Sequence, residues 1–112
     1  MKTALITGGS GHVGANLVRE LTKQDFKVRC IDFDGDHRAF EGHAVELIRG
    51  NITNIESMDV AFKDVDVVFH TAALISLVRK DRDIIRSVNV LGTKNVCELS
   101  LRHGVKKLIH FS

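Results

Sequence analysis

The chain opens with a short apolar run that leads into a glycine-rich segment, Ala4-Leu5-Ile6-Thr7-Gly8-Gly9-Ser10-Gly11-His12-Val13-Gly14. The apolar run predicts a buried strand, and the residues that follow the glycines have the apolar spacing of a helix. Where a strand turns into a helix, the first amide groups lack helical partners and the helix dipole favours an anion. The glycines permit a tight turn and close approach of the main chain to a pyrophosphate. The dinucleotide-binding residues expected here are Gly8, Gly11, His12, Val13 and Gly14.

A carboxylate after the second apolar run indicates which dinucleotide the site prefers. The run Val28-Arg29-Cys30-Ile31 ends at Asp32, 18 positions after Gly14, close to the roughly 20 expected for an acid that binds the adenosine ribose. A carboxylate at this place accepts hydrogen bonds from both ribose hydroxyls and repels a 2′-phosphate. The predicted cofactor is therefore NAD rather than NADP. The alternative is a buried strand–helix turn followed by an unrelated surface Asp.

Length and composition fit one globular domain. The 112 residues are 44% hydrophobic and 27% charged, with 16 basic and 14 acidic residues and a formal net charge of +2. These proportions are ordinary, and the charges are interspersed, so they favour neither nucleic acid nor a membrane as partner. No apolar stretch approaches the roughly 20 residues that span a bilayer. We expect no signal peptide and a cytoplasmic protein.

The cysteines and histidines suggest no metal or redox site. Cys30 and Cys97 lie far apart in the sequence, outside any Cys-x-x-Cys pair, and the histidines lack the spacing of metal ligands. Both cysteines are therefore expected to be small, buried, apolar residues.

Strand and helix signals alternate along the chain. Strands are expected at about 2–7, 27–32, 44–49, 65–70 and 106–111, and helices at about 12–24, 54–63 and 82–103, with a short helical turn near 36–41. The expected fold is an α/β, Rossmann-type three-layer sandwich. Its parallel sheet has about five strands in the order 3-2-1-4-5, with a ligand crevice between strands 1 and 4. A flavodoxin-like or receiver-like domain shares the alternation but fits the glycine spacing poorly.

Two more segments fall at the same edge of the predicted sheet. Asn51 follows the third strand, where its side chain can reach an adenine edge or serve as a turn residue or cap. His70 ends the fourth strand and is expected to orient its neighbours rather than to catalyse. The small residues after it leave room for a cofactor, although helix packing also favours alanine. The further cofactor-binding residues expected from these segments are Asn51, Ile52, Thr71, Ala72 and Ala73.

The helix predicted over 82–103 contains a glycine and a set of apolar residues. Gly92 costs about 1 kcal/mol relative to alanine in a helix, which indicates close approach to the sheet, another helix or the cofactor. Thr53 or Asn54 can cap the preceding helix, and Gly104 suits the left-handed residue that ends a helix. The residues of this helix expected mostly in the core are Val88, Leu91, Val96, Leu99 and Leu101.

Together these motifs resemble the extended short-chain dehydrogenase/reductase family. Within it, the chain is most similar to the dihydroflavonol-reductase and nucleotide-sugar-epimerase branch. The matching motifs are Thr7-Gly8-x-x-Gly11-x-x-Gly14, Asp32, Gly50-Asn51-Ile52-Thr53, Val68-Phe69-His70-Thr71-Ala72-Ala73, Asn89-Val90-x-Gly92-Thr93-x-Asn95 and Leu108-Ile109-His110-Phe111-Ser112. They follow the order and spacing of the family along the whole chain. Asn51 departs from the Asp that the family usually has, although both side chains can accept from the adenine amino group.

The resemblance implies NAD(P) chemistry on a sugar nucleotide, a flavonoid-like ketone or a steroid-like alcohol. Family members use a serine after the fifth strand and then a Tyr-x-x-x-Lys pair, in which tyrosine is the general acid/base. This chain has no tyrosine, and Ser112 is adjacent to the expected catalytic serine. Residues 1–112 are therefore expected to be a truncated NAD(P)-binding domain without the catalytic helix and the substrate domain.

Two functions remain as alternatives. The chain is either the cofactor-binding half of an oxidoreductase or epimerase, or a stand-alone module that binds a dinucleotide or a partner without catalysis. If the chain is the cofactor-binding half, we expect it to bind the cofactor without turnover, and to bind a small-molecule substrate only within the full-length parent. An open fifth strand and the long helix predict self-association.

Overall fold

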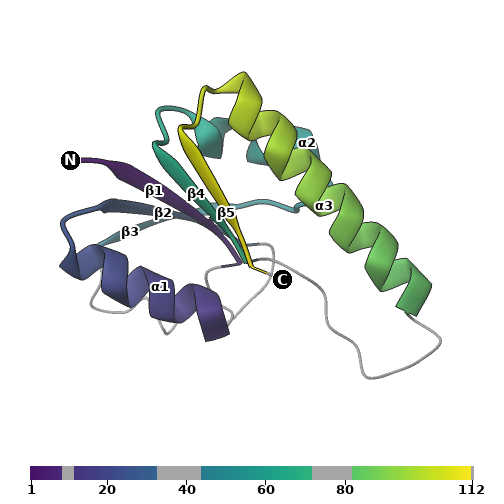
Figure 1. Ribbon diagram of the computed structural model, residues 1–112, viewed down its shortest axis with the longest axis horizontal. Coiled ribbons are helices and arrows are strands. Elements are labelled where there is room, and N and C mark those ends of the chain that lie inside the picture. The colour runs from purple at the N-terminus through teal and green to yellow at the C-terminus, as the bar shows by residue number, and fades with distance from the viewer. Residues whose placement is uncertain (9–11, 33–43, 72–81, 112) are drawn as a thin grey trace.

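The computed structural model describes residues 1–8, 12–32, 44–71 and 82–111, which form a sheet flanked by helices (Figure 1). The strands are β1 (Thr3–Thr7), β2 (Lys27–Asp32), β3 (Val45–Arg49), β4 (Val67–His70) and β5 (Lys107–His110). The helices are α1 (His12–Lys23), α2 (Ile55–Met58), the 3-10 helix η2 (Asp59–Phe62) and α3 (Arg82–Arg102). The helix expected over 54–63 is thus two short turns of different type, while the turn expected near 36–41 lies outside the described residues.

The strands form one parallel sheet in the order β3-β2-β1-β4-β5. This confirms the predicted topology and differs from the 2-1-3-4-5 order of flavodoxin-like domains. After β3 the chain crosses back over the sheet and adds β4 beside β1. The switch point therefore lies between the carboxyl ends of β1 and β4, where Thr7 pairs with His70.

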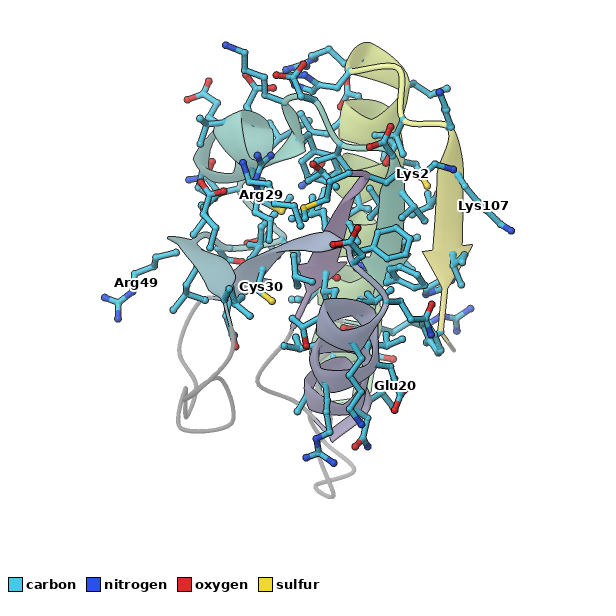
Figure 2. All side chains as sticks on the ribbon, turned by 90° about the vertical axis from the view of Figure 1, so that its left-hand side faces the viewer. Lys2, Glu20, Arg29, Cys30, Arg49 and Lys107 are labelled. Carbon is cyan, nitrogen blue, oxygen red and sulfur yellow. The ribbon has the colours of Figure 1, made fainter. Side chains whose placement is uncertain are left out.

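Alternation of side chains along the strands creates two cores, one on each face of the sheet. The core under α1 contains Ala4, Ile6, Val18, Leu21, Val28 and Cys30. The core under α2, η2 and α3 contains Leu5, Ile31, Met58, Ala61, Phe62, Val65, Val68, Val96 and Leu99. Figure 2 shows the same alternation on β2, where Arg29 and its neighbour Cys30 point to opposite faces. Helices cover both faces (Figure 1), which confirms the three-layer sandwich.

Of the five core residues expected on α3, two are confirmed, two are wrong, and Val88 is half-buried. Val96 and Leu99 are fully buried, but Leu91 and Leu101 are 43% and 85% exposed. One stripe of the helix faces the sheet, with the i, i+3, i+4, i+7, i+8 spacing of an amphipathic helix. This stripe consists of Gly92, Asn95, Val96, Leu99 and Ser100. Leu91 and Leu101 flank the stripe, and Cys97 is only half-buried rather than buried as expected.

Among the described helices, none combines the length and the apolar character that crossing a bilayer requires.

Candidate functional site

The start of α1 lies toward the carboxyl edge of the sheet, where β1 ends (Figure 1). Gly8 has a φ of 71°, in the left-handed region that glycine adopts without steric cost. Its N–H donates to the carbonyl of Ile31 at 2.9 Å, so the chain stays attached to β2 as it leaves the sheet. The first turn of α1 contains an exposed Val13 and a buried Gly14. Amide groups and the dipole at such a helix start attract an anion.

Asp32 and the segment after β3 lie next to each other at this edge. The carbonyl of Asp32 accepts a hydrogen bond from the N–H of Gly50 at 3.2 Å. A Cβ on Gly50 would lie 3.1 Å from Cγ2 of Ile31 and 3.2 Å from the carbonyl oxygen of Ser57. The absence of a side chain therefore lets the chain pass close to β2. As a result Asp32, at the end of β2, and Asn51, just after β3, lie beside each other.

Asn51 organises a tight turn. Its Oδ1 accepts hydrogen bonds from the N–H of Thr53 at 3.0 Å and from the Thr53 hydroxyl at 2.8 Å. Its own N–H donates to Oγ of Ser57 at 3.0 Å. Asn54 caps α2 by accepting from the N–H of Ser57. Of the two roles expected for Asn51, these contacts are those of a turn residue. The adenine contact stays a prediction, and one made through Oδ1 would compete with both Thr53 bonds.

His70 connects three elements beneath the switch point. The side chain is 2% exposed, with Nδ1 2.7 Å from Oγ1 of Thr7 on β1 and Nε2 3.2 Å from Oγ1 of Thr93 on α3. Its ring stacks on His110 with centroids 5.2 Å apart. Burial, and next the charge of His110, lowers the pKa of His70 to about 4. A neutral imidazole has one donor and one acceptor nitrogen, which suits two hydroxyl partners.

Thr71 joins the segments that follow β1 and β4. Its N–H donates to the carbonyl of Thr7 at 3.3 Å and to the Thr7 hydroxyl at 3.1 Å. Its own hydroxyl donates to the Thr7 carbonyl and lies 3.4 Å from the Gly8 carbonyl. The turn that begins at Gly8 and the segment that begins at Thr71 are therefore bound together at their first residues.

The structure thus brings together the expected site residues that it describes, in an order that follows the strands. Asn51, Asp32, Gly8 and Thr71 leave β3, β2, β1 and β4 in turn, at one edge of the sheet. Gly11, Ala72, Ala73 and Ser112 lie outside the described residues, and His12 is the first residue of α1.

Thr7 and Thr93, the two partners of His70, were not predicted as site residues. They lie 63 and 23 positions from His70 in the sequence. No local pattern marks contacts over such distances, because they depend on how the crossovers pack.

Within the described ranges, no group of three or more His, Cys, Asp or Glu side chains is placed to hold a metal ion. Burial, and next the charge of Asp32, raises the pKa of the Cys30 thiol to about 12. Cys30 therefore stays a protonated, buried thiol at neutral pH.

Comparison with known proteins identifies the family. Residues 5–112 match the 3-beta hydroxysteroid dehydrogenase/isomerase family. The chain belongs to this family. One curated relative is sterol demethylase protein B of Methylococcus capsulatus, which is 40% identical over 111 residues, covering 98% of this chain and 34% of that protein. The resemblance to dehydrogenases and epimerases that the motifs indicated is therefore confirmed.

Solved structures of similar fold agree with this assignment to the 3-beta hydroxysteroid dehydrogenase/isomerase family. The crystal structure of the Bordetella bronchiseptica enzyme WbmG in complex with NAD superimposes with a TM-score of 0.86 at 29% identity, covering 98% of this chain and 37% of that one. The UDP-glucose 4-epimerase of Thermus thermophilus, also a complex with NAD, gives 0.84 at 28% identity, covering 95% and 36%. The chain spans about a third of the length of these relatives.

Proposed function

We propose that this chain is the NAD(P)-binding N-terminal part of an oxidoreductase or epimerase, with NAD as its preferred cofactor. The observation that carries the proposal is the order of Asn51, Asp32 and Gly8 on adjacent strands at one sheet edge. This is the order of adenine, ribose and pyrophosphate along a dinucleotide bound across a switch point. That two structural neighbours are NAD complexes supports the choice of cofactor.

Each part of the dinucleotide is proposed to contact a different segment of this edge. The helix start takes the pyrophosphate, Asp32 takes the ribose hydroxyls, and the segment after β4 borders the nicotinamide end. At the adenine end the Asn51 amide group and the Ile52 main chain make the contact, because Oδ1 of Asn51 is held by Thr53. The proposed cofactor-binding residues are Gly8, Gly11, His12, Val13, Gly14, Asp32, Asn51, Ile52, Thr71, Ala72 and Ala73.

For the whole protein we propose a sugar nucleotide, or a flavonoid- or steroid-like ketone or alcohol, as the substrate. The sterol and UDP-glucose names of two relatives support these classes. Residues 1–112 contain no tyrosine, so we propose that this chain alone binds the cofactor without turnover. The alternative is a stand-alone dinucleotide-binding module. A reading frame that continues past Ser112 into a Tyr-x-x-x-Lys pair supports the first proposal, and a stop codon supports the second.

Replacing Asp32 with alanine is expected to narrow the preference for NAD over NADP by roughly tenfold or more, the range of a lost hydrogen bond to a charged group. The variant loses the ribose contacts with NAD and the repulsion of the 2′-phosphate of NADP. Titration calorimetry of wild type and variant with both dinucleotides measures the ratio of the dissociation constants for NADP and NAD.

Glu20→Ala is the matched control, because it removes an equal charge from the exposed side of α1 (Figure 2). It should leave both affinities unchanged. An unaltered NAD/NADP ratio in Asp32→Ala would mean that this carboxylate does not recognise the ribose.

We also propose that the protein self-associates through the outer edge of β5 or the outer face of α3. On α3, Val90 and Leu101 are 62% and 85% exposed, and a strand edge invites further pairing. The sedimentation coefficient is therefore expected to rise with protein concentration. A single monomeric species at all concentrations would contradict the proposal.

The charge distribution supports a protein without a nucleic-acid or membrane partner. The basic and acidic residues nearly balance, 16 against 14, whereas nucleic-acid and anionic membrane surfaces select strongly basic patches. We accordingly propose a cytoplasmic location.

A further inference from the structure

Gly92 of α3 gives Ile52 the space that it occupies. A Cβ on Gly92 would lie 2.4 Å from Cδ1 and 2.8 Å from Cγ1 of Ile52, well inside van der Waals contact. Glycine weakens a helix relative to alanine because it loses more backbone entropy on folding. Its position in the middle of α3 therefore has a packing reason, namely the side chain of the residue that follows Asn51.

Asn95 holds the same residue by its main chain. It lies three residues after Gly92 on the buried stripe, is 8% exposed, and donates from Nδ2 to the carbonyl of Ile52 at 2.9 Å. Neighbouring positions on one face of α3 thus fix both the side chain and the carbonyl group of Ile52. The contact spans 43 positions of sequence.

Internal hydrogen bonds brace the turn that contains Ile52. Thr53 donates twice to Oδ1 of Asn51, and the N–H of Asn51 donates to Ser57. A substitution on α3 that displaces Ile52 is therefore expected to displace Asn51 as well. Gly50, the residue before Asn51, donates from its N–H to the main-chain carbonyl of Asp32, so the turn is also tied to the strand that ends at the proposed ribose-binding residue.

We propose that Gly92 and Asn95 are positioning residues for the adenine end of the cofactor site. From α3, on one face of the sheet, they fix the place of the turn Asn51-Ile52-Thr53 at the sheet edge. This inference rests on the proposed binding of NAD. It adds two residues that do not touch the cofactor themselves but determine where its adenine contacts lie.

The test measures NAD binding to wild type, Gly92→Ala and Asn95→Ala by titration calorimetry. Each variant is expected to raise the dissociation constant by about three- to tenfold, the range of one net hydrogen bond. Saturation-transfer NMR then compares the adenine and nicotinamide protons of bound NAD. In both variants the adenine signal should fall relative to the nicotinamide signal, which a uniform loss of folded protein would not produce.

A second change tests the contact itself. Ile52→Ala in the Gly92→Ala background removes Cγ1 and Cδ1, the two atoms that the new Cβ would meet most closely. The double variant is expected to recover part of the lost affinity. Ser87→Ala, at an exposed position of the same helix, is the matched control and should bind NAD as wild type does.

The possible results separate this proposal from the one on which it rests. If folded wild type binds no NAD, the proposed function fails, and the positioning role fails with it. If wild type binds NAD and both folded variants match it in affinity and in the adenine signal, only the positioning role is overturned. Asn95→Ala introduces no clash, so it tests the proposal even where Gly92→Ala unfolds the chain, as melting curves by circular dichroism would reveal.

Discussion

Phe62→Ala is expected to lower the free energy of unfolding by about 3–5 kcal/mol, the usual loss for truncating a large core side chain. Phe62 ends η2, is fully buried, and belongs to the core between the sheet and α3. Its ring also stacks on His103 at 6.4 Å, so that it connects the crossover to the end of α3. Because domains are stable by only about 5–15 kcal/mol, this loss is a large part of the total.

Urea unfolding followed by circular dichroism measures the change as a shift in midpoint at constant slope. Val60→Ala is the matched control, since Val60 is on the same 3-10 helix but is 67% exposed. Its effect should stay within about 0.5 kcal/mol. Similar midpoints for the two variants would show that Phe62 does not have the role in the core described above.

Acidification is expected to destabilise the fold through His70. In the unfolded chain its imidazole takes up a proton near pH 6.5, whereas burial lowers the pKa in the folded protein to about 4. Between these values the unfolded state holds the extra proton, so stability falls as the pH falls, by up to about 1.4 kcal/mol per pH unit. Above pH 6.5 His70 adds no pH dependence, and below pH 4 both states are protonated.

Urea midpoints measured across this window for wild type and His70→Gln isolate the contribution. The variant cannot titrate, so its stability should depend less steeply on pH over the window. Asp59, whose pKa is lowered by its hydrogen bond with His103, contributes below its ordinary value of 3.8 and therefore outside the window. Equal slopes for the two proteins would show that His70 is not kept neutral by the fold.

The helix ends could be predicted because their signals are local, and the strand order because alternating strands and helices with right-handed crossovers allow few topologies. Short apolar runs between helical segments indicate parallel strands, and the glycine turn with the acid at 32 selects the switch-point topology. Asn54 accepts from the N–H of Ser57 as a helix cap should, and Gly104 has the left-handed φ, 68°, expected after α3. Each of these two helix-end features depends on a few neighbouring residues, which sequence patterns describe well.

Long-range contacts, in the core as in the site, could not be predicted because they join segments that lie far apart in the sequence. Arg29 lies in an apolar run, yet its buried guanidinium donates to the carbonyls of Ala61 and Lys63 at 2.7 and 2.8 Å and to Glu46 at 3.1 Å. Its partners lie 17 to 34 positions away. The exposed Leu91 and Leu101 of α3 were likewise expected in the core. The presence of leucine does not by itself indicate which side of a long helix packs on the sheet.

The hydrogen bonds from Gly8 to Ile31, from Gly50 to Asp32 and from Thr71 to Thr7 all join main-chain atoms. Side-chain replacement leaves such bonds in place so long as the glycines that admit them remain. The path of the chain around the site can therefore persist while most surrounding residues change. A site whose shape depends on main-chain hydrogen bonds can keep that shape at low sequence identity, as the solved structure with 29% identity and a TM-score of 0.86 illustrates. Substitutions can then change which ligand is recognised while the path of the backbone stays the same.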